Sequence, residues 1–72
     1  MIDRRTLTEL LDKEPFQRFR IYMSDGHAYE VTNPGNMVPM DSMLFIVLPH
    51  DNWKFLNYAQ VTRIESIETQ AA

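Results

Sequence analysis

The chain has 72 residues, a net charge of −3 and no cysteine. Its length excludes a multidomain protein, so residues 1–72 are expected to form a single domain with a marginal core. The absence of cysteine excludes disulfide bonds and cysteine-based zinc sites. Hydrophobic residues make up 44% of the chain and charged residues 24%, a balance that is typical of a folded globular protein and not of a disordered one.

The negative charge lies mainly after residue 20, because the first 20 residues carry a small excess of basic side chains. An acidic surface disfavours nonspecific nucleic-acid binding, which depends on neutralising phosphates. No segment approaches the roughly 20 apolar residues of a membrane span, and the charged N-terminus lacks the apolar region of a signal peptide. The sequence therefore predicts a cytoplasmic protein without a membrane partner.

The first predicted element is a helix over residues 3–13. Its leucines fall on one face at helical spacing, Asp3 and Thr6 are alternative N-caps, and Pro15 ends the helix. A helix of about ten residues is marginal on its own. We therefore expect the leucine face to dock over one end of a sheet.

A β-hairpin is the strongest structural signal, and it spans residues 19–32 around the Asp-Gly dipeptide at 25–26. A three-residue loop pairs Ile21 with Tyr29 and puts Gly26 in the left-handed conformation of a bulge. The alternative two-residue turn mixes apolar and charged residues on one face. The three-residue loop is preferred because it makes both faces of the hairpin consistent.

Four further segments are expected to be extended. Residues 37–40 contain a proline and are predicted as an edge or a bulge. Residues 43–48 form the most apolar run and are predicted as a central strand, covered on one face by the core and on the other by the helix or another subunit. Residues 53–58 form the next strand, and residues 62–68 form the last one, with a bulge or an end near position 66. Residues 69–72 are expected to be a frayed tail.

The order of elements predicts a mainly β fold with one N-terminal helix, in which five strands form a small antiparallel barrel over residues 18–68. Several motifs resemble those of a family of short uncharacterised bacterial proteins with the pattern PF-x-x-FRI…DG-x-x-YEV-x-x-P…V-x-x-I-E. These motifs are Pro15-Phe16, Phe19-Arg20-Ile21, Asp25-Gly26-His27, Tyr29-Glu30-Val31, Asn33-Pro34 and Val61-Thr62-Arg63-Ile64-Glu65. The resemblance implies a bacterial source and supplies no activity.

The layout is also similar to SH3-like and Sm-like barrels, which begin with a helix and continue with five strands. Bacterial Sm-like RNA chaperones form rings and carry a Tyr-Lys-His-Ala segment before the last strand. The matching segment here is 57–61, in which Tyr58 takes the aromatic position and the Lys-His pair is missing. This resemblance leaves ring assembly open and makes RNA binding the weaker expectation.

The candidate binding residues are Arg18, Arg20 and Tyr22, which alternate along the first predicted strand and therefore share one face. Tyr58 joins them through the Sm-like resemblance. Arginine and aromatic side chains together can hold single-stranded nucleic acid by charge and stacking. The alternatives stay open, because Glu30 is expected opposite Arg20 and exposed arginines are commonly solvated.

No set of catalytic residues is apparent in the sequence. The two histidines, His27 and His50, lie in predicted turns, where they are expected to be solvated. A metal site would need a further ligand brought in by folding, and the close ligand spacing of zinc sites is absent. The sequence therefore predicts no enzyme, no metal and no other cofactor, and an enzyme or metal protein that uses the two histidines is the third hypothesis.

The leading hypothesis for function is a non-enzymatic protein-interaction or self-assembling module. It rests on the small size, the missing catalytic residues and the apolar run at 43–48, which needs cover on both faces. The alternative is an Sm-like nucleic-acid (RNA) binding protein. The expected partner is another copy of the chain or another protein, with nucleic acid disfavoured by the net charge.

Overall fold

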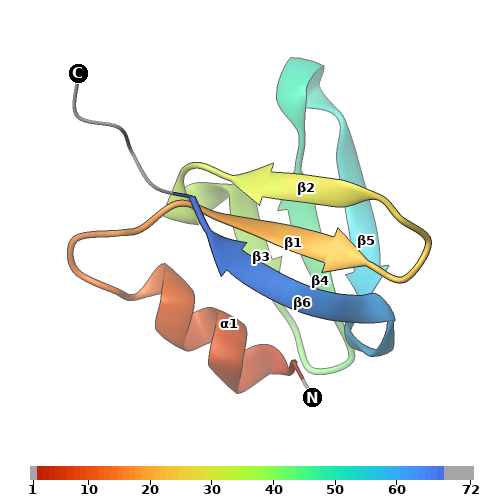
Figure 1. Cartoon of the computed structure of the whole chain (residues 1–72). Helices are drawn as coiled ribbons and strands as arrows, with labels where there is room; N and C mark the ends of the chain where they lie inside the picture. Colours follow the sequence, from red (N-terminus) through yellow and green to blue (C-terminus); the bar gives the residue numbers. More distant parts are fainter. Residues whose placement is uncertain (1, 68–72) are drawn as a thin grey trace.

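In the computed structural model, residues 2–67 form one helix and two small antiparallel sheets of three strands each (Figure 1). The helix and strands are α1 (Arg4–Leu11), β1 (Phe19–Met23), β2 (Ala28–Val31), β3 (Met37–Pro39), β4 (Met43–Val47), β5 (Trp53–Asn57) and β6 (Val61–Ser66). Three short 3₁₀ turns connect them: η1 (Pro34–Asn36), η2 (Pro49–Asp51) and η3 (Tyr58–Gln60). The chain is thus mainly β with one N-terminal helix, as the sequence predicts.

The first sheet has the strand order β2-β1-β6. The hairpin of β1 and β2 has the predicted register, since Ile21 pairs with Tyr29 and Phe19 pairs with Val31. Gly26 has a φ of 92°, which a residue with a Cβ adopts at a cost. The predicted three-residue loop is therefore confirmed, and it directs Phe19 and Ile21 into the core.

The second sheet has the order β3-β4-β5, so the apolar run forms the central strand as predicted. The prediction of a single five-stranded barrel is wrong for residues 2–67, because six strands form two sheets and no closed barrel. The additional strand is β3, in which Val38 pairs with Phe45 and Pro39 lies opposite Leu44. An edge strand tolerates proline because it pairs with a neighbouring strand on one side only. The turn η1 separates β3 from β2.

The core lies between the inner faces of the two sheets. Leu44 and Ile46 of β4 are fully buried there, opposite Phe19 and Ile21 of β1. The complete set of buried apolar residues is Leu7, Phe19, Ile21, Met23, Val31, Met37, Leu44, Ile46, Leu56 and Tyr58. Along β1 and β4 these residues alternate mainly with partly buried ones, which is the pattern of a sheet with one buried face.

The helix is shorter than the predicted range of 3–13 and begins after Asp3, whose side chain accepts a hydrogen bond from the Thr6 backbone N–H at 3.0 Å. This bond is the main reason that the pKa of Asp3 lies below its ordinary value. Leu7 is the buried residue of the helix and joins the core. The helix therefore docks through its leucine face, as expected from its length.

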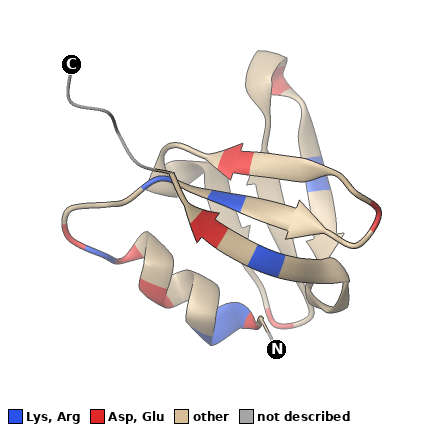
Figure 2. Ribbon diagram, viewed as in Figure 1, with Lys and Arg blue, Asp and Glu red and all other residues tan. Residues whose placement is uncertain are grey.

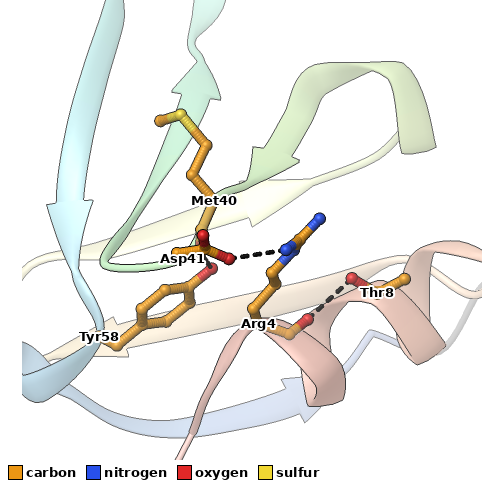
Figure 3. A network of polar contacts seen from close by, with 5 residues as sticks. All are labelled: Arg4, Thr8, Met40, Asp41 and Tyr58. Atoms are coloured by element: carbon orange, nitrogen blue, oxygen red, sulfur yellow. Dashed lines mark hydrogen bonds and ion pairs between the residues drawn. The ribbon is translucent and has the colours of Figure 1, made fainter.

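An exposed ion pair links α1 to the turn between β3 and β4 (Figure 3). Arg4 forms an ion pair of 2.6 Å with Asp41 of that turn, and the Thr8 hydroxyl donates to the Arg4 carbonyl at 2.8 Å. The Tyr58 hydroxyl donates to the Met40 carbonyl at 2.6 Å in the same turn. The helix is thereby held at one end of the second sheet, where it contacts β3.

The last strand ends at Ser66, as predicted from the spacing of the isoleucines. Residue 68 of the predicted strand and the predicted tail at 69–72 lie outside the described residues. No helix within residues 2–67 is long and apolar enough to cross a membrane.

Candidate functional site

The predicted arginine and tyrosine residues meet on the outer face of the first sheet. Arg20 donates a hydrogen bond from Nη1 to the Tyr22 hydroxyl at 3.3 Å. Arg63 of β6 lies over the Tyr22 ring at 3.8 Å from its centroid, a cation–π contact. Arg63 was not among the predicted site residues. The pairing of β1 with β6 brings it opposite Tyr22, and this register is not visible in the local sequence.

Each of these two arginines is paired with a carboxylate, so the strip carries as much negative as positive charge. Figure 2 shows the basic and acidic positions close together on β1, β2 and β6. Arg20 Nη2 lies 2.6 Å from Glu30 Oε2, and Arg63 Nε lies 3.1 Å from Glu65 Oε2. Hydrogen bonds to Tyr22 and then Glu30 raise the pKa of Arg20 above its ordinary value. We call these five residues the charged ladder: Arg20, Tyr22, Glu30, Arg63 and Glu65. It is neutral in sum, which weakens its attraction for phosphates.

The structure places Tyr58 away from the charged ladder. Tyr58 lies in η3, is only 8% exposed and belongs to the core. Burial is the main cause that raises the pKa of its hydroxyl. Arg18 precedes β1, is half-buried, and its carbonyl accepts a hydrogen bond from the Ile67 N–H at 2.9 Å. Of the four predicted binding residues, Arg20 and Tyr22 are in direct contact, whereas Tyr58 supports the core.

Replacing Tyr58 with phenylalanine is expected to lower the free energy of unfolding by about 1 kcal/mol, because the Met40 carbonyl loses its donor. The melting temperature should then fall by about 4–8 °C. The raised pKa means that the folded state holds the phenolic proton more tightly than the unfolded state. This contribution is complete below the ordinary value of 10.0 and is lost as the pH rises through the folded pKa. Above pH 10 the stability of the variant should therefore decline less steeply than that of the wild type.

The matched control is Tyr29→Phe, which removes a hydroxyl that accepts from Lys54 at 3.1 Å on the surface. Thermal melts at neutral and alkaline pH compare the two variants. An equal loss in both would show that the Tyr58–Met40 bond adds nothing specific to stability.

The two histidines occupy separate turns. His27 Nδ1 lies 3.0 Å from Asp25 Oδ2 in the β1–β2 loop, and its ring stacks on Tyr29 with 6.4 Å between centroids. The hydrogen bond from the His27 backbone N–H is the main cause that lowers the pKa of Asp25. His50 and Asp51 both have positive φ, as in the hairpin turns that twist with the strands. Residues 2–67 contain no group of three or more His, Cys, Asp or Glu side chains that could hold a metal ion.

The most distinctive surface is the outer face of the second sheet. Side chains alternate along β4, so Leu44 and Ile46 face the core while Phe45 faces outward. The strand register places Phe45 between Val38 and Phe55. We call this surface the outer apolar face, and it consists of Val38, Met43, Phe45, Val47, Trp53 and Phe55.

Three aromatic rings form the centre of the outer apolar face. Phe45 and Phe55 have their centroids 5.4 Å apart, Trp53 lies 5.6 Å from Phe55, and Trp53 lies 6.0 Å from Phe45. Trp53 is 59% exposed, Phe55 53%, Val38 51% and Met43 39%. These four are the exposed large apolar side chains of the described chain, and all of them lie on this one face. An apolar cluster of this size on a surface is typical of an interaction site.

The helix does not cover the outer apolar face. Its buried residue, Leu7, belongs to the core between the sheets, and Arg4 reaches Asp41 at the end of β3. The expectation that β4 is covered on both faces therefore holds for its inner face alone within residues 2–67. Of the two covers considered for the outer face, the helix is excluded and another molecule remains.

Two hollows were compared with this surface. An open groove of about 790 Å³ runs between β2 and the β4–β5 turn, and its lining includes two carboxylates, Glu30, which is held by Arg20, and Asp51. A smaller hollow of about 300 Å³ lies between α1 and the first sheet, and its lining mixes apolar with polar side chains, among them Lys13. Neither gathers apolar aromatic surface as the outer apolar face does.

No family model matches the chain, and neither a curated protein nor a solved structure matches it.

Proposed function

We propose that this chain is a non-enzymatic interaction module that binds protein through its outer apolar face. The observation that carries the proposal is the clustering of all four exposed large apolar side chains on the outer side of β3, β4 and β5. Tryptophan, phenylalanine and methionine are enriched at protein interfaces, and charged residues are depleted at interface centres. The outer apolar face has this composition.

Binding of single-stranded nucleic acid is the less supported alternative. Its support is the Arg20–Tyr22–Arg63 stack on the first sheet, where a base could pack. Both arginines already have carboxylate partners, and the six residues of the outer apolar face include no cation to attract phosphates. Affinity that is absent even at low salt would exclude this alternative.

The proposal includes an SH3-like or Sm-like layout and a cytoplasmic bacterial setting. In this layout, β2 and β3 count as two halves of one bent strand. The turn η1 that separates them has only three residues, which supports this reading. The order of elements then becomes a helix followed by five strands. The central position of β1 between β2 and β6 agrees with that arrangement.

A photo-crosslinking amino acid at position 55 tests the proposed function in the cell that naturally makes the protein. The side chain at this position is half exposed at the centre of the outer apolar face. We expect it to form covalent adducts with protein on illumination. The control position is Ala28, which is exposed on the first sheet opposite Tyr22 and should give few adducts.

The masses of the adducts separate the possible results. An adduct of twice the chain mass indicates a second copy, and any other discrete mass indicates a different protein. Adducts that are equally frequent at positions 55 and 28, or absent at both, would contradict an interaction role for the outer apolar face.

A further inference from the structure

We infer that the partner of the outer apolar face is a second copy of this chain, and that the two copies pack face to face about a two-fold axis. This inference rests on the proposed function and specifies its partner. In such an arrangement, the same patch of both copies forms the interface, and the aromatic cluster of Phe45, Trp53 and Phe55 lies near the axis, where equivalent residues of the two copies come close together.

The charge distribution favours a second copy. None of the six residues of the outer apolar face is charged, although the chain carries a net charge of −3. The charged residues of the strands lie on β1, β2 and β6, apart from Lys54 of β5 (Figure 2). The Lys54 ammonium donates to the Tyr29 hydroxyl at 3.1 Å, away from the outer apolar face. Two identical acidic molecules can approach through this face without placing like charges in contact.

The area of the face reaches the lower limit of what a specific pair needs. Half-exposed aromatic side chains bury on the order of 100 Å² each when they are covered, so the whole face offers roughly 500 Å² of apolar surface per copy. Two copies thus bury about 1,000 Å² before the polar rim is included, which reaches the threshold for a specific interface. Because only the folded chain can form the pair, association shifts the folding equilibrium toward the folded state, and a chain with a small core gains stability in this way.

The shape of the face also suits a second sheet. Val38, Phe45 and Phe55 lie side by side across three paired strands, which makes a pleated surface rather than a groove. Sheets bury such surfaces by packing on other sheets, with their strands within about 30° of each other. The inner side of β4 already packs on the first sheet, whose strands run across it (Figure 1), and a second copy would supply the missing layer for its outer side.

Trp53 reports on this association directly, because it is the only tryptophan in the sequence and is 59% exposed in the single chain. Sedimentation equilibrium of the purified full chain over a range of concentrations should show a monomer–dimer equilibrium. The Trp53 emission should move to shorter wavelength over the same range, because the indole leaves water as the pair forms. A monomer at every concentration with unchanged emission would overturn the inference.

Charge exchange at position 55 tests the face-to-face geometry. Phe55→Lys and Phe55→Glu each place like charges near the axis, so each variant alone should associate at least about 30-fold more weakly than the wild type. An equimolar mixture should recover a dimer that contains one chain of each kind. The same two substitutions at Ala28 should leave association unchanged. Association that is insensitive to both substitutions at position 55 would contradict the proposed face.

Circular dichroism confirms that each variant is folded. Val38→Lys replaces Phe55→Lys if the latter unfolds, since Val38 is 51% exposed on the same face.

A variant that ends at Ile67 tests whether residues 68–72 cover the outer apolar face. If that truncation alone shifts the Trp53 emission of a monomer to longer wavelength, the inference is wrong. A monomeric wild type that crosslinks from position 55 to a different protein would refute the second copy and leave the interaction role standing. A monomer without adducts would refute both.

Discussion

Replacing Leu44 with alanine is expected to lower the free energy of unfolding by about 3 kcal/mol. Leu44 is fully buried on the inner side of β4, opposite Leu56 of β5. The substitution removes apolar contacts and leaves a cavity that the two-layered structure closes only in part. A domain of this size has few kcal/mol of total stability, so the variant should be partly unfolded at room temperature. Urea titration followed by circular dichroism measures this loss.

The matched control is Phe45→Ala, one residue further along the same strand. Phe45 is partly exposed on the outer apolar face, so its truncation should cost about 1 kcal/mol in the monomer, although more atoms are removed. Both titrations are made at concentrations too low for self-association. A larger loss for Phe45→Ala than for Leu44→Ala would show that the two faces of β4 have been assigned the wrong way round.

Replacing Leu7 with alanine is expected to cost about 3 kcal/mol and to detach α1 from the sheets. Leu7 has no exposed surface and is the buried residue of an eight-residue helix. A helix this short does not persist in water without tertiary contacts. The melting temperature should therefore fall by more than 10 °C, at about 4–8 °C per kcal/mol, and the helical circular dichroism signal should weaken together with it.

Glu9→Ala in the same helix is the control for the Leu7 variant. Glu9 forms a 3.4 Å surface ion pair with Arg5, and both side chains are largely exposed, so removing it should leave the melting temperature nearly unchanged. Loss of helical signal without loss of thermal stability in Leu7→Ala would mean that the sheets fold independently of α1.

The features that the sequence predicts well depend on neighbouring residues. The hairpin register follows from the position of Gly26 and from the alternation of apolar residues on both sides of it. The central position of β4 follows from its uncharged composition, because a strand at a sheet edge is usually protected by charge or proline. The helix was placed correctly to within about two residues, as its cap and the following proline both act locally.

The features that it does not predict depend on contacts between distant segments. The stacking of Arg63 on Tyr22 requires the pairing of β1 with β6, and no local pattern sets that register. The five-stranded prediction omits residues 37–40, which the proline marks as an edge or a bulge, and β3 is an edge strand that pairs with β4 on one side. Tyr58 was assigned to a surface by resemblance, and the hydrogen bond to Met40 that retains it in the core links segments 18 residues apart.

The outer apolar face was anticipated in part. The run at 43–48 suggested a strand with cover on both faces, and the sequence left the helix and another subunit as the alternatives. The attachment of α1 through Arg4 to Asp41 decides against the helix, and this contact between residues 37 positions apart could not be read from composition.

The two sheets give this small molecule two sides of opposite character. One side carries the charged ladder, in which each arginine has a carboxylate, and the other carries the exposed aromatic rings. When two copies join through their aromatic sides, both ladders turn to the water, and the described part of either chain retains no further exposed large apolar side chain. In the proposed pair, growth therefore stops at two chains, and the pair is closed with a hydrophilic exterior instead of a filament.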